Sequence, residues 1–199
     1  YSSSGNQGLI LGCNDSGVAH FKGYLDEVRW VVGENPFPVG GFTPSQYRYG
    51  TAGATHEVST ASNMKLLIHS EQEEDSSDLK NIITKYGTVI PNTGTTAYTG
   101  GNGAWKFDGN SDYLKTPFSS EFDFGTGDFT IEGHFRKTGT AATQVLIAKH
   151  GRTAGNDSEW YLRFQSSGNE LNFYVGDADH AYTHGLSNSG VDVWVHLAV

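Results

Sequence analysis

The sequence predicts an all-β protein built as an antiparallel β-sandwich, and three observations support that prediction. The 199 residues include 26 glycines and only five prolines, so residues that form turns are frequent. Aromatic residues make up 13% of the chain, and aromatic and β-branched residues favour strands. Apolar runs recur at intervals of roughly 8 to 15 residues between Gly, Asn, Asp and Ser clusters, which is typical of a sandwich.

The strand candidates fall into two blocks. The first block holds a short apolar run at 9–12 and a longer run of mixed polarity at 21–32. The second block opens with the apolar run at 64–70. Its further candidates lie at 89–94, 105–117, 128–137, 144–151, 160–166, 171–177 and 191–199.

Two polar segments lie between the strand candidates at the start of the second block. The acidic run EQEED at 71–75 is interpreted as a solvent-exposed turn. The following segment, 76–87, predicts a short helical turn, because Ser77 or Asp78 can cap its first residues. Three apolar residues share one face of that turn: Leu79, Ile82 and Ile83.

Charge and composition exclude several kinds of partner. The formal net charge is −9 and only 13 residues are Lys or Arg, whereas nucleic-acid binding depends on clustered basic residues. No run of about 18 apolar residues is present, so we expect no membrane insertion. Cys13 is the only cysteine, and an intrachain disulfide is therefore impossible.

The stretch between the two blocks predicts a linker. Three of the five prolines, Pro36, Pro38 and Pro44, precede a segment at 50–62 that is rich in Gly, Ala, Thr and Ser.

The last apolar run ends without a turn, and a domain rarely stops inside a core strand because its edge would stay unpaired. We therefore expect the sequence to be cut from a longer one.

Three phrases resemble a known family. FKGYLDEVRW at 21–30 resembles a closing strand, and the phrase from WKFDGNSDYL to DFTIEGHFRK at 105–137 resembles two opening strands. WVHLAV at 194–199 is similar to a central strand. The family that they resemble is the laminin-G-like, concanavalin A-like lectin/glucanase superfamily, whose fold is a two-sheet jelly roll.

The order of these phrases implies partial copies of two tandem repeats, because the closing phrase precedes the opening ones. Residues 1–47 are then the C-terminal part of one repeat, 48–62 a linker, and 63–199 the N-terminal part of the next. Such joints resemble those in phage tail and bacterial surface proteins. In the alternative arrangement, residues 1–32 supply the closing strands that the second block lacks.

The resemblance implies binding rather than catalysis. Glucanases of this superfamily place two carboxylates on one strand face, because two acids must flank the glycosidic bond, and no E-x-D-x-E pattern occurs here. We expect a non-catalytic carbohydrate-binding or adhesion module of a virion tail fibre or extracellular surface protein. Its partners are then cell-surface glycans or glycoproteins and neighbouring repeats. The alternative is a purely structural repeat that builds a fibre or particle decoration.

One polar turn is a candidate structural calcium site. Asp108, Asn110 and Asp112 lie in the turn FDGNSD, and clustered oxygen ligands suit Ca²⁺. The resemblance adds Asp26, since the closing strand commonly lies beside the opening strand in this superfamily. The alternative is an Asx turn, in which the Asp108 carboxylate binds its own backbone.

Aromatic residues near two loops are candidates for sugar binding. Sugar sites combine aromatic faces with polar groups. Four aromatic residues lie in or near the loops expected at 150–159 and 176–185: Trp160, Tyr161, Tyr174 and Tyr182. The alternative is that Trp160 and Tyr174 are strand residues that fill the core.

Overall fold

The fold was obtained as a computed structural model. The structure describes residues 8–14, 17–33, 61–70, 73–97, 101, 103–123, 125–139, 143–150, 158–165, 170–175, 181–185 and 192–199. Most of the predicted linker, 48–62, lies outside them.

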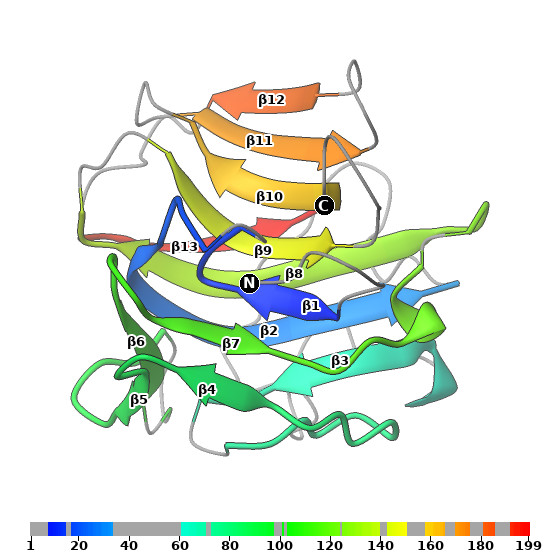
Figure 1. Cartoon of the computed structure of the whole chain (residues 1–199), viewed down its shortest axis with the longest axis horizontal. Helices are drawn as coiled ribbons and strands as arrows, with labels where there is room; N and C mark the ends of the chain where they lie inside the picture. Colours follow the sequence, from blue (N-terminus) through cyan, green and yellow to red (C-terminus); the bar gives the residue numbers. More distant parts are fainter. Residues whose placement is uncertain are drawn as a thin grey trace.

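The described residues form two antiparallel sheets that face each other (Figure 1), which confirms the predicted β-sandwich. The first sheet has the strand order β12-β11-β10-β9-β1-β7-β4, and the second has the order β13-β8-β2-β6-β5, with β3 also paired to β2. The strands are β1 Leu9–Leu11, β2 Lys22–Val32, β3 Met64–Ile68, β4 Thr84–Tyr86, β5 Ile90–Asn92, β6 Ala104–Asp108, β7 Tyr113–Lys115, β8 Phe129–Lys137, β9 Gln144–His150, β10 Ser158–Phe164, β11 Glu170–Val175, β12 Ala181–Gly185 and β13 Trp194–Ala198. Two short 3-10 helices span Ala61–Asn63 and Ser120–Phe122.

The N-terminal strands β1 and β2 lie inside the sheets rather than at their edges. β1 pairs with both β7 and β9 in the first sheet. β2 pairs with β8 along one side, and with β6 and then β3 along the other. Figure 1 shows both strands, in blue, among the green and yellow strands of the second block. The first block therefore shares both sheets with the second.

The core between the sheets is rich in aromatic residues. Trp30 of β2 stacks on Trp160 of β10, with ring centroids 4.8 Å apart and an interplanar angle of 15°. Both indoles are buried, and so are Phe21, Trp105 and Phe107. Stacked aromatic rings add to the free energy gained by burying their apolar area. One indole from each sheet thus ties the two layers together.

The helical turn predicted for 76–87 does not form. The Asp75 carboxylate instead accepts the backbone N–H groups of Ser77 and Asn81, each at 2.9 Å. A side chain that captures backbone donors competes with helical hydrogen bonds. Thr84–Tyr86 then forms strand β4.

The expectation of a solvent-exposed turn at 71–75 is wrong for Asp75. Its carboxylate is only 1% exposed and accepts the backbone N–H of Leu67 at 2.9 Å. An acidic side chain can be buried when hydrogen-bond donors surround it. Asp75 therefore organises this loop.

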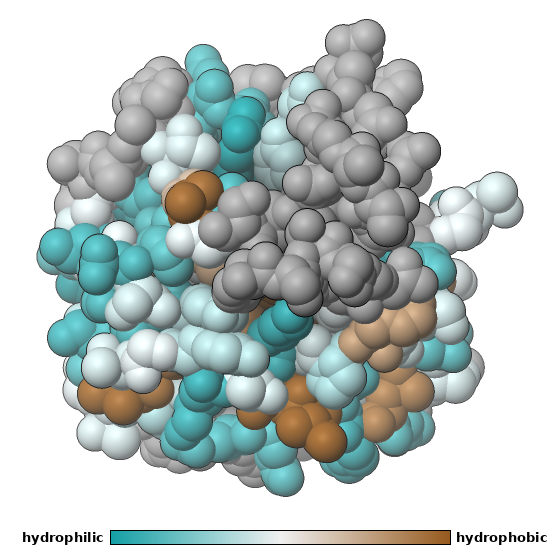
Figure 2. Space-filling model, in the orientation of Figure 1, coloured by the Kyte–Doolittle hydropathy of each residue, from teal (hydrophilic) through white to brown (hydrophobic). Residues whose placement is uncertain are grey.

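The surface that carries β4, β7 and β1 is largely hydrophilic. Figure 2 shows teal and white residues over most of its described part, with a few separate brown patches. Exposed apolar residues that occur singly are normal on soluble domains. No helix in the described ranges is long and apolar enough to cross a membrane.

Candidate functional site

Strand β10 divides its side chains between the core and the outer face of the first sheet. Trp160, Leu162 and Phe164 are between 1% and 2% exposed. Tyr161 and Arg163 alternate with them and are half-buried. Because successive side chains of a strand point to opposite faces, Tyr161 and Arg163 lie on the outer face.

The outer face carries a compact aromatic and cationic cluster, which we call the β10–β11 patch: Tyr161, Arg163 and Tyr174. Tyr161 is paired with Tyr174 across β10 and β11, and their rings stack with centroids 4.9 Å apart and an interplanar angle of 8°. The Arg163 guanidinium carbon lies 4.9 Å from the Tyr161 ring centroid and 6.0 Å from that of Tyr174. Such distances are those of cation–π contacts.

Burial raises the pKa of the Tyr161 hydroxyl. The Arg163 guanidinium acts in the opposite direction, and Tyr174 adds to the rise. Tyr161 therefore stays protonated at neutral pH and can both donate and accept a hydrogen bond.

The four predicted sugar-binding residues do not form one cluster. Trp160 is 1% exposed and packs in the core, whereas Tyr161 and Tyr174 stack on the outer face. Tyr182 lies on β12, opposite Phe173 in the register, and its side chain lies outside the described part. The prediction of a loop at 176–185 is wrong for Ala181–Gly185, which forms β12.

Arg163 was not singled out from the sequence. The signal that would have identified it is the alternation in WYLRFQ at 160–165, where apolar core residues alternate with polar ones. That pattern places Arg163 on the same face as Tyr161.

The turn at Asp108 is an Asx turn, which was the alternative to a calcium site. Oδ1 of Asp108 accepts the backbone N–H groups of Asn110, Ser111 and Asp112 at 2.8, 2.9 and 3.1 Å. Although burial acts to raise the pKa of Asp108, these hydrogen bonds lower it to about 2. The carboxylate thus organises an Asx turn.

The other predicted calcium ligands are divided between two places. Asp112 accepts the N–H of Thr88 at 2.5 Å and that of Asp108 at 3.0 Å. Asp26 lies on β2 opposite His134, whereas Asp108 is opposite Lys22. No group of three or more His, Cys, Asp or Glu side chains suited to a metal occurs in the described ranges. Calcium binding stays a prediction of the sequence.

One protein-family model matches the C-terminal part of the chain. Residues 108–199 match the family model described as the concanavalin A-like lectin/glucanases superfamily. The concanavalin A-like segment runs from the end of β6 to β13 and contains the β10–β11 patch. No curated protein and no solved structure matches the chain.

The match to the concanavalin A-like superfamily model indicates carbohydrate binding or adhesion in general terms. The match covers one segment, so the division of the chain into parts of two tandem copies stays a prediction. β1 and β2, which lie outside the matched segment, nevertheless pair with its strands β7, β8 and β9.

A second polar cluster joins β2 to the concanavalin A-like segment through a buried ion pair. Arg29 Nε donates to Glu132 Oε1 at 2.6 Å, and both side chains are at most 1% exposed. His196 Nε2 of β13 lies 3.1 Å from Glu132 Oε2. Glu132 therefore links three neighbouring strands of the second sheet.

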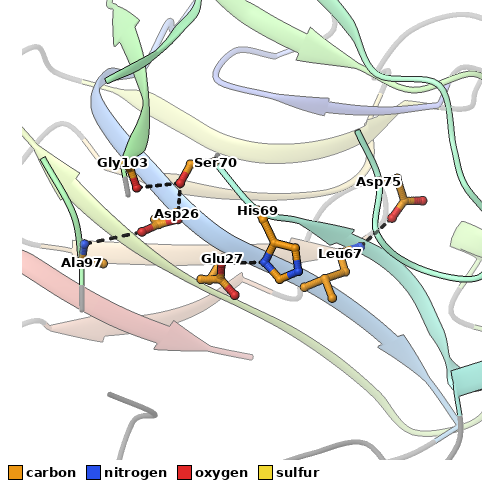
Figure 3. Close-up of polar contacts among 8 residues, drawn as sticks. All are labelled: Asp26, Glu27, Leu67, His69, Ser70, Asp75, Ala97 and Gly103. Atoms are coloured by element: carbon orange, nitrogen blue, oxygen red, sulfur yellow. Dashed lines mark hydrogen bonds and ion pairs between the residues drawn. The ribbon is translucent and has the colours of Figure 1, made fainter. Parts of the chain in front are cut away.

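The same strand β2 carries two more buried acids, which contact the residues that follow β3 (Figure 3). His69 Nδ1 lies 2.6 Å from Glu27 Oε1. The Ser70 hydroxyl lies 2.5 Å from Asp26 Oδ1 and 2.6 Å from the Gly103 carbonyl oxygen. Asp26 also accepts the N–H of Ala97 at 3.5 Å. Both carboxylates thus have polar partners despite their burial.

Glu27 sits at an irregularity in β2. The register with β8 shifts between Asp26 and Arg29, and Glu27 has a φ of +51°. A left-handed residue other than glycine stores backbone strain, which persists only where surrounding contacts hold it. The contact with His69 supplies such a restraint. The sequence showed only the phrase YLDEVR, and a bulge has no reliable signal in polarity alone.

Acid is expected to destabilise the sandwich through His134 of β8. Burial lowers the pKa of His134 to about 3; His196 adds to the decrease and Glu132 opposes it. The unfolded chain binds a proton below about pH 6.5, whereas folded His134 stays neutral down to its own pKa. The free energy of unfolding therefore falls as the pH drops from about 6.5 toward 3.

We expect His134→Gln to weaken this dependence. The measurement is the melting temperature of both proteins from pH 8 to pH 4, with the difference at pH 8 as the reference. Asp26, which is opposite His134, is part of the same environment and is retained in both proteins. Parallel curves for the two proteins would contradict the assignment to His134.

Proposed function

We propose that the chain is a non-catalytic carbohydrate-binding or adhesion module of an extracellular surface protein or a virion tail fibre. Its partner is then a glycan or glycoprotein at a cell surface, together with neighbouring repeats of the same assembly. The observation that carries this proposal is the β10–β11 patch. It lies within the concanavalin A-like segment and on the outer face of the first sheet.

The chemistry of the patch suits a sugar. Tyrosine rings present apolar edges together with hydroxyl groups, and sugars offer both C–H surfaces and hydroxyls. The stacked arrangement of Tyr161 and Tyr174 restricts both side chains before a ligand arrives. A site organised in advance loses less conformational entropy on binding.

The acids of the second sheet support a role without hydrolysis. A glycosidase holds two carboxyl groups about 5 Å or more apart on either side of the scissile bond. Here Asp26, Glu27 and Glu132 are each at most 2% exposed. Their partners are Ser70, His69 and Arg29, respectively. Buried acids held by such contacts stabilise the sheet rather than contact a substrate.

Replacing Tyr174 with alanine is expected to weaken glycan binding about tenfold or more, as truncation of an aromatic contact residue commonly does. A glycan array selects the best-bound sugar, and calorimetry on that sugar then compares the variant with the unaltered protein. Both measurements are made with millimolar Ca²⁺ and again with EDTA, which also tests the calcium prediction.

The matched control is Tyr86→Ala. Tyr86 is also a partly exposed tyrosine of the first sheet, and it stacks on Tyr113 with ring centroids 4.3 Å apart. It lies on β4, at the opposite edge of the sheet from β11. An array without hits, or equal losses in the two variants, would contradict the proposed function.

A further inference from the structure

Two polar atoms at the C-terminal end of β10 and just after it are buried beside the β10–β11 patch. They are Nε of Arg163 and Oε1 of Gln165, and neither has a hydrogen-bond partner within the part of the chain that the structure describes. Residues two apart on a strand share a face, so both side chains lie in one line with Tyr161. Polar atoms that are buried without a partner cost free energy, so the described residues do not fully satisfy the polar side chains at this end of β10.

Arg163 differs from the other arginine that lies over a tyrosine ring in the described ranges. Arg136 lies over Tyr24, with its guanidinium carbon 5.6 Å from the ring centroid. Its Nη2 and Nε also lie 2.7 and 2.9 Å from Asp192 Oδ1. Within the same ranges, no carboxylate lies at ion-pair distance from Arg163. Arg136 thus has an internal counter-ion, whereas Arg163 has none among the described residues.

We propose that the β10–β11 patch binds an acidic saccharide through its carboxylate group, with Arg163 as the residue that determines specificity. This inference rests on the proposed function and adds the class of ligand to it. The planar guanidinium matches the two oxygens of a carboxylate. The Tyr161 and Tyr174 rings hold the guanidinium in place, and Gln165 offers an amide to a neighbouring hydroxyl.

The surroundings of Arg163 are compatible with a bound anion. Asn172 is opposite Arg163 on β11 and is uncharged. Glu170 is the acid on the same strand face, two residues before Asn172, and it is not within ion-pair distance of Arg163. The net charge of −9 is spread over the chain, and physiological salt screens charges beyond about 8 Å. Local contacts therefore decide the preference.

The test uses pairs of glycans that differ in one charged group. The probes are an oligogalacturonate and its methyl ester, a sialylated glycan and its desialylated form, and a sulfated glycan and its desulfated form. The unaltered protein is expected to bind the carboxylate-bearing member of at least one pair about tenfold more tightly. Arg163→Gln is expected to bring that ratio close to one, and Arg163→Lys, which keeps charge without the planar fork, to give an intermediate ratio.

Arg136→Gln is the matched control and is expected to leave the ratio unchanged. Circular dichroism and the melting temperature establish that each variant is folded, and Arg163→Lys provides a second variant if Arg163→Gln is not. Equal binding of charged and neutral partners would overturn the acidic-ligand inference while leaving the proposed function in place. A preference for sulfate alone would also overturn it. Absence of binding to every glycan would instead contradict the proposed function itself.

Discussion

Replacing Glu132 with glutamine is expected to lower the free energy of unfolding by about 3–5 kcal/mol, because the Arg29 charge is then buried without its counter-ion. Both side chains are at most 1% exposed, so water cannot take the place of the lost carboxylate. The measurement is equilibrium unfolding in urea, compared at constant m-value. The double variant Arg29→Met with Glu132→Leu removes both charges and is expected to recover most of the loss.

The matched control is Asp192→Asn, which removes the counter-ion of Arg136. That pair is solvent-exposed, with Asp192 59% and Arg136 27% exposed. Exposed pairs contribute about 0–1 kcal/mol, so we expect this variant to unfold close to the unaltered protein. If Glu132→Gln were as mild as Asp192→Asn, the Arg29–Glu132 pair would not stabilise the second sheet.

Replacing Trp160 with alanine is expected to lower the free energy of unfolding by about 3–5 kcal/mol, as truncation of a large core aromatic does. The indole stacks on Trp30 across the two sheets and is 1% exposed. Loss of this contact leaves a cavity at the centre of the sandwich. Thermal and urea unfolding measure the change.

A second variant at this position distinguishes two interpretations of Trp160, as a residue that contacts sugar or as a residue of the core. Trp160→Phe keeps an aromatic ring in the core and is expected to cost less stability and to retain glycan binding. Tyr161→Ala, on the neighbouring outward-facing position, is expected to show the opposite pattern, with weaker binding and a smaller loss of stability. Weaker binding by a fully folded Trp160→Phe would contradict the assignment of Trp160 to the core.

The strands were predictable because their signal is local. Runs such as 128–137 and 160–166 carry apolar residues in step with a sheet, and they became β8 and β10. The matched family segment likewise contains the phrase DFTIEGHFRK that suggested the superfamily. Local polarity therefore gave the fold class and the approximate position of most strands.

What the sequence did not reveal depends on which partners the side chains find in the folded protein. The sequence around Asp75 does not indicate that its carboxylate accepts the backbone N–H groups of Ser77 and Asn81. The helical pattern at 76–87 is misleading because these N–H groups are already bound by the carboxylate. Likewise, the left-handed conformation of Glu27 is explained by its contact with His69, which follows β3 and lies 42 residues further along the chain. Tyr161 and Tyr174 were singled out by residue type, but their stacking follows from the register of β10 and β11.

The central position of β2 has a consequence for the order in which the sandwich assembles. β2 pairs with β3, β6 and β8, all of which come later in the chain. Because synthesis starts at the N-terminus, this eleven-residue strand emerges before any of its partners in the second sheet. Long-range closure makes such topologies slow to fold, and an unpaired strand is a template for pairing with another chain. The strand at the centre of the second sheet is thus the one most vulnerable to wrong pairing while the protein is being made.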